Sequence, residues 1–181
     1  TNTDFGNYYQ GIDFSNNSTL LSQLQKLNKT KRTKLVGYSS MPSKFYETDY
    51  DPNNKSKVIG FYTNKSATYS GNMNREHVWP CSKMQLTDEM RPDASTRNHT
   101  SDLHNLRAAC PTVNGYHNDK YYGEENAEGV MYPNVTSGIA GKHNFTGDFR
   151  GDVARIMFYM YIRYDGLKLT DNIENADKTS M

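Results

Sequence analysis

Residues 74–80 of the chain read NREHVWP, which places a carboxylate, Glu76, directly beside an imidazole, His77. A second polar motif, DLHNL, follows at residues 102–106, and a carboxamide follows at Asn114. Hard cations such as magnesium take oxygen ligands and commonly bind only one or two from the protein, with water and phosphate completing the shell. A neutral histidine is the side chain best suited to accept a proton near neutral pH. If these side chains converge, they can hold one cation and deprotonate a water beside it, which is the chemistry of phosphodiester cleavage.

The pattern around these motifs predicts two strands followed by a helix. A strand through His77 is expected to stop at the proline three residues later, and residues 103–108 alternate as a second strand would. Thr112 can then cap a helix that contains Asn114. Because successive side chains of a strand point to opposite faces, the adjacent carboxylate and imidazole can reach one cation only at a bulge or a strand end.

Two further helices and one short strand are expected outside these motifs. Leucines on one face indicate a helix from Thr19 to Asn28 with Ser18 as its cap, and residues 58–62 are typical of a strand. After Asp148, an apolar stripe predicts a core helix over about residues 149–164, against which Trp79 is expected to pack. The remaining long segments are expected to be loops or a frayed C-terminal tail: residues 81–101, 124–147 and 167–181.

The composition predicts a polar domain with no overall charge preference. A chain of 181 residues is long enough to bury one core, so residues 1–181 are interpreted as a single domain. The formal net charge is only +1, from 21 basic and 20 acidic residues, so any affinity for phosphate must come from a local patch. The densest basic cluster lies at residues 29–34, which is either a solvated surface or a nucleic-acid contact.

The compartment is indicated only indirectly. No apolar run approaches the length of about 20 residues that a membrane span needs. The chain begins at Thr1 rather than at methionine, so we expect a mature form from which a targeting segment was removed, and a secreted or cell-surface location. Cys81 and Cys110 could form one disulfide, but antiparallel pairing of the strands around His77 and Leu106 would separate them, which favours two free thiols.

Taken together, these motifs resemble the bacterial endonuclease I family of nonspecific nucleases, part of the ββα-metal or His-Me finger superfamily. The matching runs occur in the family's order and cover roughly residues 70–165: residues 74–80, 102–106, 113–115 (VNG), 150–155 (RGDVAR) and 158–160 (FYM). The resemblance implies an α+β fold with a ββα finger at about residues 74–122, surrounded by helices and long loops. It also implies a monomeric bacterial hydrolase that cuts DNA and RNA without sequence preference and leaves 5′-phosphates.

The resemblance also implies roles for individual residues. His77 matches the general base that activates the attacking water. Glu76 and Asn114 match the protein ligands of a single magnesium ion, or of another divalent cation such as Mn²⁺ or Ca²⁺. Asp102 and His104 match the second-strand motif and are expected to orient the finger rather than to perform chemistry.

One departure from the family pattern concerns the cation that would hold the phosphate. Relatives commonly follow Asn-Gly with a residue and then an arginine, whereas this chain has His117 at that position. A transition state with extra negative charge needs a fixed cation besides the metal, so other arginines are candidates: Arg91, Arg97 and Arg107, of which Arg97 and Arg107 are assigned to the site and Arg97 is favoured. The other histidines, His99, His117 and His143, are expected at the surface.

Two other interpretations compete with the nuclease. His77, Cys81, His104 and Cys110 could ligate a structural zinc in a nucleic-acid-binding module, but their spacing fits no familiar zinc pattern. The fold could also have lost its activity and act as a binder. The presence of Glu76, His77 and Asn114 together argues against both alternatives.

Overall fold

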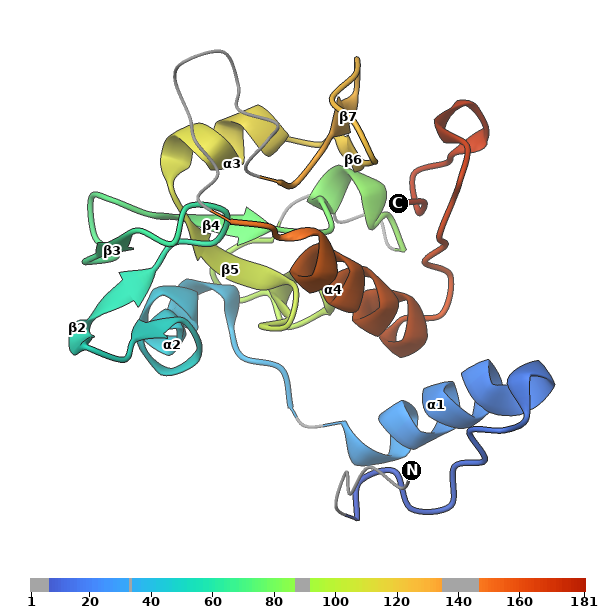
Figure 1. Ribbon diagram of the computed structural model, residues 1–181. Coiled ribbons are helices and arrows are strands. Elements are labelled where there is room, and N and C mark those ends of the chain that lie inside the picture. The colour runs from blue at the N-terminus through green and yellow to red at the C-terminus, as the bar shows by residue number, and fades with distance from the viewer. Residues whose placement is uncertain (1–6, 33, 87–91, 135–146) are drawn as a thin grey trace.

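The computed structural model describes residues 7–32, 34–86, 92–134 and 147–181. Within these residues the chain is of the α+β class, as expected, with helices and short strands interspersed (Figure 1). The helices are α1 (Asn17–Lys31), α2 (Met41–Thr48), α3 (Pro111–His117) and α4 (Arg150–Arg163), with 3-10 turns η1 (Tyr38–Ser40), η2 (Cys81–Lys83), η3 (His99–Ser101) and η5 (Ile173–Asn175). The strands are β1 (Tyr50–Asp51), β2 (Asn54–Ile59), β3 (Ser66–Ala67), β4 (Asn74–His77), β5 (Leu106–Ala109), β6 (Tyr121–Tyr122) and β7 (Val130–Met131). They form an antiparallel sheet β1–β2–β3, an antiparallel pair β4–β5 and a parallel pair β6–β7.

Strands β4 and β5 form the antiparallel pair that the sequence predicts, with His77 opposite Leu106. The second strand is shorter than expected, because the backbone N–H groups of Asn105 and Leu106 both donate to the Asp102 carbonyl and fold residues 102–105 into a turn. Helix α3 follows directly and packs against β4. The order strand, strand, helix is that of the ββα finger.

Helix α3 begins two residues earlier than the sequence suggested. Pro111 occupies its first turn, where a missing N–H group costs no hydrogen bond, and Cys110 is the N-cap residue. Thr112 therefore lies inside the helix, and its proposed role as a cap is wrong.

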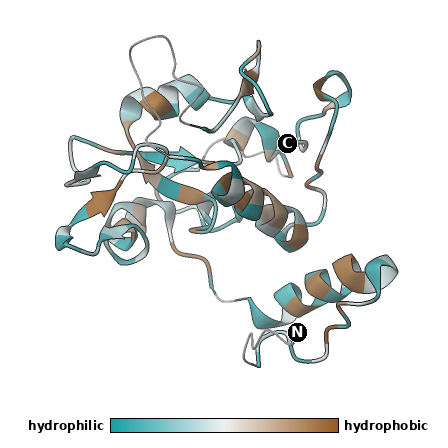
Figure 2. Ribbon diagram, in the orientation of Figure 1, coloured by the Kyte–Doolittle hydropathy of each residue, from teal (hydrophilic) through white to brown (hydrophobic). Residues whose placement is uncertain are grey.

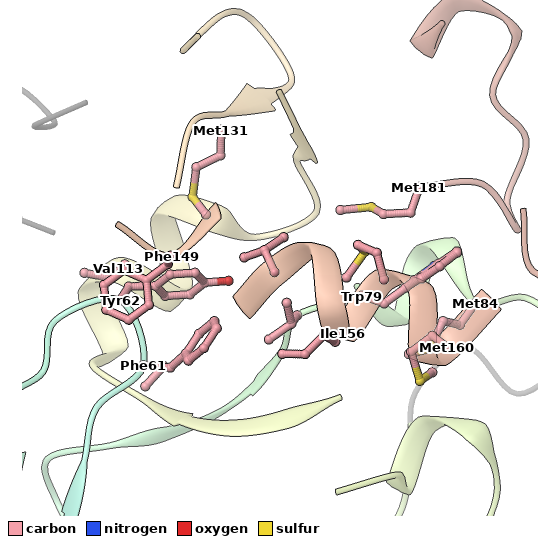
Figure 3. Packing of buried hydrophobic residues seen from close by; sticks show 14 of the residues in the cluster. Phe61, Tyr62, Trp79, Met84, Val113, Met131, Phe149, Ile156, Met160 and Met181 are labelled. Atoms are coloured by element: carbon pink, nitrogen blue, oxygen red, sulfur yellow. The ribbon is translucent and has the colours of Figure 1, made fainter. Parts of the chain in front are cut away.

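The main core lies between the finger and α4. Trp79, fully buried just after β4, packs with Met84, Ile156 and Met160, as expected for this residue (Figure 3). Figure 2 shows hydrophobic residues along α4 and on β5, whereas β4 is hydrophilic. A second cluster joins α2 to β2 and β5 through Phe45, Val58 and Leu106, so β5 contributes to both cores.

The bounds of helix α1 and of strand β2 differ slightly from those predicted. The helix expected over residues 19–28 is present and longer, with Asn16 rather than Ser18 as its N-cap residue. It packs against α4, and the Asn28 side chain accepts a hydrogen bond of 3.0 Å from Arg163. Strand β2 ends at Ile59, so Phe61 and Tyr62 leave the sheet and enter the main core instead.

The C-terminal segment is not a frayed tail, and that prediction is wrong. Leu167 and Met181 are buried in the main core. The Lys168 and Met181 backbones are linked by an N–H to carbonyl hydrogen bond of 3.0 Å, and Lys178 accepts another of 3.1 Å from Gln85. The apolar side chains at the two ends of this segment, rather than its polar middle, decide its packing.

Among the helices that the structure describes, none has the length and apolar composition needed to cross a bilayer. The single domain over residues 1–181 stays a prediction. The two thiols, Cys81 and Cys110, are free, as favoured from the strand pairing.

Candidate active site

His77 is the last residue of β4, and its ring is held on two sides. Its Nε2 lies 2.7 Å from the Thr100 carbonyl oxygen, which can only accept, so Nε2 carries the hydrogen and Nδ1 carries the free lone pair. Its face stacks on the Tyr38 ring, with 5.8 Å between centroids and 19° between planes. Burial, opposed by the Thr100 hydrogen bond and reinforced by the nearby Arg75 charge, lowers the pKa of His77 to about 4. The ring is therefore neutral at neutral pH, with Nδ1 able to accept a proton.

Glu76, one residue earlier, is buried, with an exposed fraction of only 1%. Its Oε1 accepts hydrogen bonds from the Tyr62 hydroxyl at 2.9 Å and from His117 Nδ1 at 2.6 Å. The Tyr122 hydroxyl oxygen lies 2.5 Å from that of Tyr62, and the Tyr122 ring stacks on the His117 ring. Within the described residues no hydrogen bond reaches Oε2, so the carboxylate is fixed by one oxygen and keeps the other for a ligand.

The two tyrosines of this network are held in the protonated form. Burial raises the pKa of Tyr62 and of Tyr122 well above its usual value, and the negative charge of Glu76 raises both further. Tyr62 also has a positive φ of 70°, which is uncommon for a residue with a side chain. This backbone conformation aims a hydroxyl from outside the finger at the Glu76 carboxylate.

A cavity of about 510 Å³ brings the expected site residues together. His77, Glu76 and Asn114 all line it, which agrees with the strand-end geometry that the sequence required. The Asn114 amide group donates to the Arg75 carbonyl at 3.3 Å, and this orientation leaves its oxygen for a ligand. Asp119, just beyond α3, also lines the cavity and was not singled out from the sequence.

The donor set of this cavity fits a hard cation. One carboxylate oxygen and one amide oxygen are the ligands that magnesium prefers, and they leave room for water and phosphate. Ser82 Oγ, another lining atom, is buried without a hydrogen-bond partner among the described residues, as expected where a polar ligand or water binds. Nowhere in the described parts of the chain do three or more His, Cys, Asp or Glu side chains form a metal-binding group, which argues against the structural-zinc interpretation.

The arginine in the cavity is Arg75, which sequence reasoning missed. Its guanidinium lies 4.0 Å from the Tyr38 ring centroid and donates to the Tyr38 carbonyl at 3.1 Å, and it lines the cavity with His77. Residues two apart in a strand share a face, so the sequence alternation already indicated that Arg75 lies on the same face as His77.

The two arginines assigned from the sequence lie elsewhere. Arg107 pairs with Asp49 and lies over the Phe61 ring, outside the cavity. Arg97 is exposed and packs against the backbone at Gly37, where an added Cβ would lie 3.3 Å from its Nη2. Neither lines the cavity, so the structure does not bring Arg107 or Arg97 to His77. Arg91 lies outside the described residues.

Two of the histidines expected at the surface are buried, so that prediction is wrong for His99 and His117. His99 lies 2.7 Å from the Met84 carbonyl oxygen, and His117 holds Glu76. The third, His143, lies outside the described residues. The side chain that replaces the family's usual arginine is thus a direct partner of the proposed metal ligand.

Asp102 and His104 are arranged as orienting residues. The buried Asp102 accepts hydrogen bonds from the hydroxyls of Tyr159 and Tyr164 at 3.0 and 2.6 Å, and pairs with Arg163 Nε at 2.9 Å. His104 stacks on Tyr159, with 4.1 Å between ring centroids. These contacts fasten the turn before β5 to α4.

The strand–strand–helix unit carries a strand-end histidine, a neighbouring glutamate and an asparagine on the following helix, an arrangement consistent with the class of ββα-metal nucleases. Within this class the chain belongs to the endonuclease I family, whose model matches residues 8–179.

Two curated relatives extend this assignment. The chain is 31% identical over 183 residues to a protein of Bacillus subtilis (strain 168) named extracellular ribonuclease, and 31% identical over 184 residues to the Bacillus amyloliquefaciens protein of the same name. Each alignment covers 97% of this chain but only 60% of the relative, so the chain spans about three fifths of their length. No solved structure matches the chain significantly.

Proposed function

We propose that this chain is a metal-dependent, sequence-nonspecific endonuclease that hydrolyses phosphodiester bonds in RNA and DNA and leaves 5′-phosphates. The observation that carries the proposal is the convergence of His77, Glu76, Asn114 and Arg75 on one cavity. Family membership supports the same reaction class.

His77 acts as the general base. Its Nδ1 accepts the proton of the attacking water, because Nε2 is occupied by the Thr100 carbonyl and the ring is neutral. The stack on Tyr38 prevents the ring from rotating away from the cavity. A base fixed in this way contributes about 10²- to 10⁴-fold to the rate.

Glu76 and Asn114 would hold a divalent cation through their side-chain oxygens. When bound, Mg²⁺ or another ion such as Mn²⁺ or Ca²⁺ would supply Lewis-acid stabilisation of the developing phosphate charge and of the leaving oxygen. Arg75 places a second, permanent positive charge in the same cavity and takes the role that the sequence assigned to Arg97 and Arg107.

The names of the relatives support the proposed substrate and location. Two relatives are named extracellular ribonuclease, which supports RNA as a substrate and a secreted or cell-surface enzyme. Cleavage without sequence preference requires contacts to the sugar-phosphate backbone only, so DNA is a substrate as well. A monomer suffices, since one cavity of one chain supplies every proposed group.

The test is cleavage of supercoiled plasmid and of a structured RNA by the parent and by His77→Ala, with Mg²⁺ and with EDTA. We expect nicking of both substrates by the parent, loss of activity in EDTA, and at least a hundredfold slower reaction for the variant. Thermal unfolding of both proteins checks that the variant is folded. Full activity of His77→Ala, or no cleavage by the parent with Mg²⁺, Mn²⁺ or Ca²⁺, would overturn the proposal.

A further inference from the structure

A groove of about 860 Å³ runs between α1, the turn that precedes it, and α4, and we call it the α1–α4 groove. Figure 1 shows α1 lying along one side of α4, away from the strands of the finger. The wall on the finger side is formed by residues 102–104. Phe158 on α4 and Phe14, which precedes α1, also line the groove. None of the groups proposed for hydrolysis lines it.

Exposed aromatic side chains gather at this groove. Five aromatic residues of the described chain are classed as exposed, and four of them, all except Tyr50, line the groove. Phe158 and Phe14 are the most open of these, with exposed fractions of 57% and 52%. Water-exposed aromatic rings on one surface mark a site where another molecule binds.

The groove is also rich in positive charge, although the whole chain has a net charge of only +1. Five cationic side chains line it, including Arg32 and Lys34 from the basic cluster of the sequence. Arg163 is paired with the single lining carboxylate, Asp102, and Arg155 is paired with Asp152, which lies outside the groove. Lys31, Arg32 and Lys34 form no ion pair within the described residues, which favours an anionic ligand.

Aromatic faces combined with unmatched cations fit one ligand chemistry, single-stranded nucleic acid. Unpaired bases stack on aromatic rings while the backbone phosphates pair with Lys and Arg. A double helix hides its base faces and could use only the charges. Protein partners of a basic groove would need acidic side chains, and they would leave the stacking faces without a matching chemistry.

The groove is connected to the active site through a short stretch of chain. Asp102, which forms part of the groove wall, follows Thr100 by two residues, and the Thr100 carbonyl holds His77.

We propose that the α1–α4 groove binds single-stranded segments of nucleic acid outside the catalytic cavity. That this ligand is a segment of the substrate rests on the proposed nuclease function, whereas the binding itself does not.

The first test measures binding without hydrolysis. Fluorescence anisotropy of a labelled twelve-nucleotide uridine strand is recorded in EDTA for the parent, for Arg32→Glu/Lys34→Glu, and for the matched control Lys55→Glu/Lys178→Glu, whose positions are exposed and outside the groove. We expect the groove variant to bind at least tenfold more weakly, and the control to bind like the parent. The slope of log affinity against log salt should fall by about 1.4 for two lost phosphate contacts on a single strand.

The second test separates stacking from charge. Phe158→Ala should weaken binding of the same strand about tenfold, because one base loses its stacking partner. Phe158→Trp keeps an aromatic face and should restore parental affinity. Equal binding by the parent, Phe158→Ala and the charge variant would overturn the proposal.

Three further outcomes can be distinguished. A dimer seen in sedimentation that Phe158→Ala dissociates, with strand binding unchanged, would assign the groove to a second copy of the chain and overturn the proposal. If the parent cleaves nothing but binds the strand through the groove, the proposed nuclease function fails and the groove proposal stands. If the parent cleaves and the groove variants bind normally, only the groove proposal fails.

Discussion

Glu76 and Asp102 are two buried carboxylates at the same end of the finger's strand pair, and their oxygens are hydrogen-bonded in different ways. Both oxygens of Asp102 are engaged: Oδ1 by His104, and Oδ2 by Tyr159, Tyr164 and Arg163. Glu76 receives both of its hydrogen bonds on Oε1. Oε2 has no partner within the described residues and Glu76 lines the cavity.

This difference separates a structural carboxylate, Asp102, from the proposed metal ligand, Glu76. Burying a carboxylate is costly unless hydrogen bonds and charges compensate for the lost water. Asp102 obtains that compensation entirely from α4 and its own turn, so it stabilises the fold and has no oxygen left for chemistry. In Glu76 the protein donates hydrogen bonds to only one of the two carboxylate oxygens, which is the arrangement expected of a metal ligand.

The largest expected effect is on catalysis, from Glu76→Gln. Glutamine keeps the shape and an oxygen but removes the charge that a divalent cation needs, so cleavage at a fixed Mg²⁺ concentration should fall at least a hundredfold. The measurement is plasmid nicking rate against Mg²⁺ concentration. Glu125→Gln, at an exposed position outside the cavity, is the matched control and should behave like the parent. If Glu76→Gln cleaved as fast as the parent, Glu76 would not be a metal ligand, and its free oxygen would not distinguish it from Asp102.

The next largest effect is on stability, from Asp102→Asn. Asparagine leaves Arg163 and two tyrosine hydroxyls without a carboxylate, and breaking a buried pair costs about 3 kcal/mol. The free energy of unfolding from urea denaturation should fall by that amount. The nicking rate well below the melting temperature should stay within a few-fold of the parent. A variant that is as stable as the parent but inactive would contradict the structural role assigned to Asp102 and would indicate a role in catalysis.

Local patterns predicted the finger well, because its elements are neighbours in sequence. The strand ending near Pro80, its partner at Leu106 and the helix that carries Asn114 follow from alternation and from turn residues alone. The same alternation places Arg75 on the face of His77, although only the structure drew attention to it. The family resemblance then supplied the roles of these residues.

The network that holds Glu76 could not be predicted, because its members come from outside these local patterns. Tyr62 leaves the preceding sheet at a positive φ, and Tyr122 arrives from a strand beyond α3. Tyr122 stacks on the ring of the buried His117, and the Tyr62 ring lies 6.3 Å from it. The C-terminal segment escaped prediction for a related reason, since the packing of Met181 depends on a core formed by distant residues.

A smaller effect is expected from Tyr62→Phe, which tests that network. The variant removes one of the two hydrogen bonds to Oε1 and keeps the ring in the core, a loss of about 1 kcal/mol. The Mg²⁺ concentration for half-maximal activity should rise about fivefold, with little change in the rate at saturation. Tyr116→Phe, whose hydroxyl makes only a 3.4 Å contact with Asn126, serves as the control. An unchanged Mg²⁺ dependence would show that Oε1 needs only His117.

The smallest expected effect is a change with pH in the stability difference between the parent and Asp102→Asn, which arises from the titration of Asp102. Burial raises the pKa of Asp102, but hydrogen bonds from His104 and Tyr164 outweigh it, so the folded-state pKa lies below the usual value of 3.8. A carboxyl with a lowered folded pKa stabilises the protein above its unfolded pKa and loses that contribution as the pH falls through the folded value. The stability gap between the parent and Asp102→Asn should therefore be constant from pH 7 to about 5 and should narrow below about pH 4. Other acidic groups titrate equally in both proteins and cancel in the difference. A gap that stays constant down to pH 2 would mean that the hydrogen bonds to Asp102 do not depend on its charge.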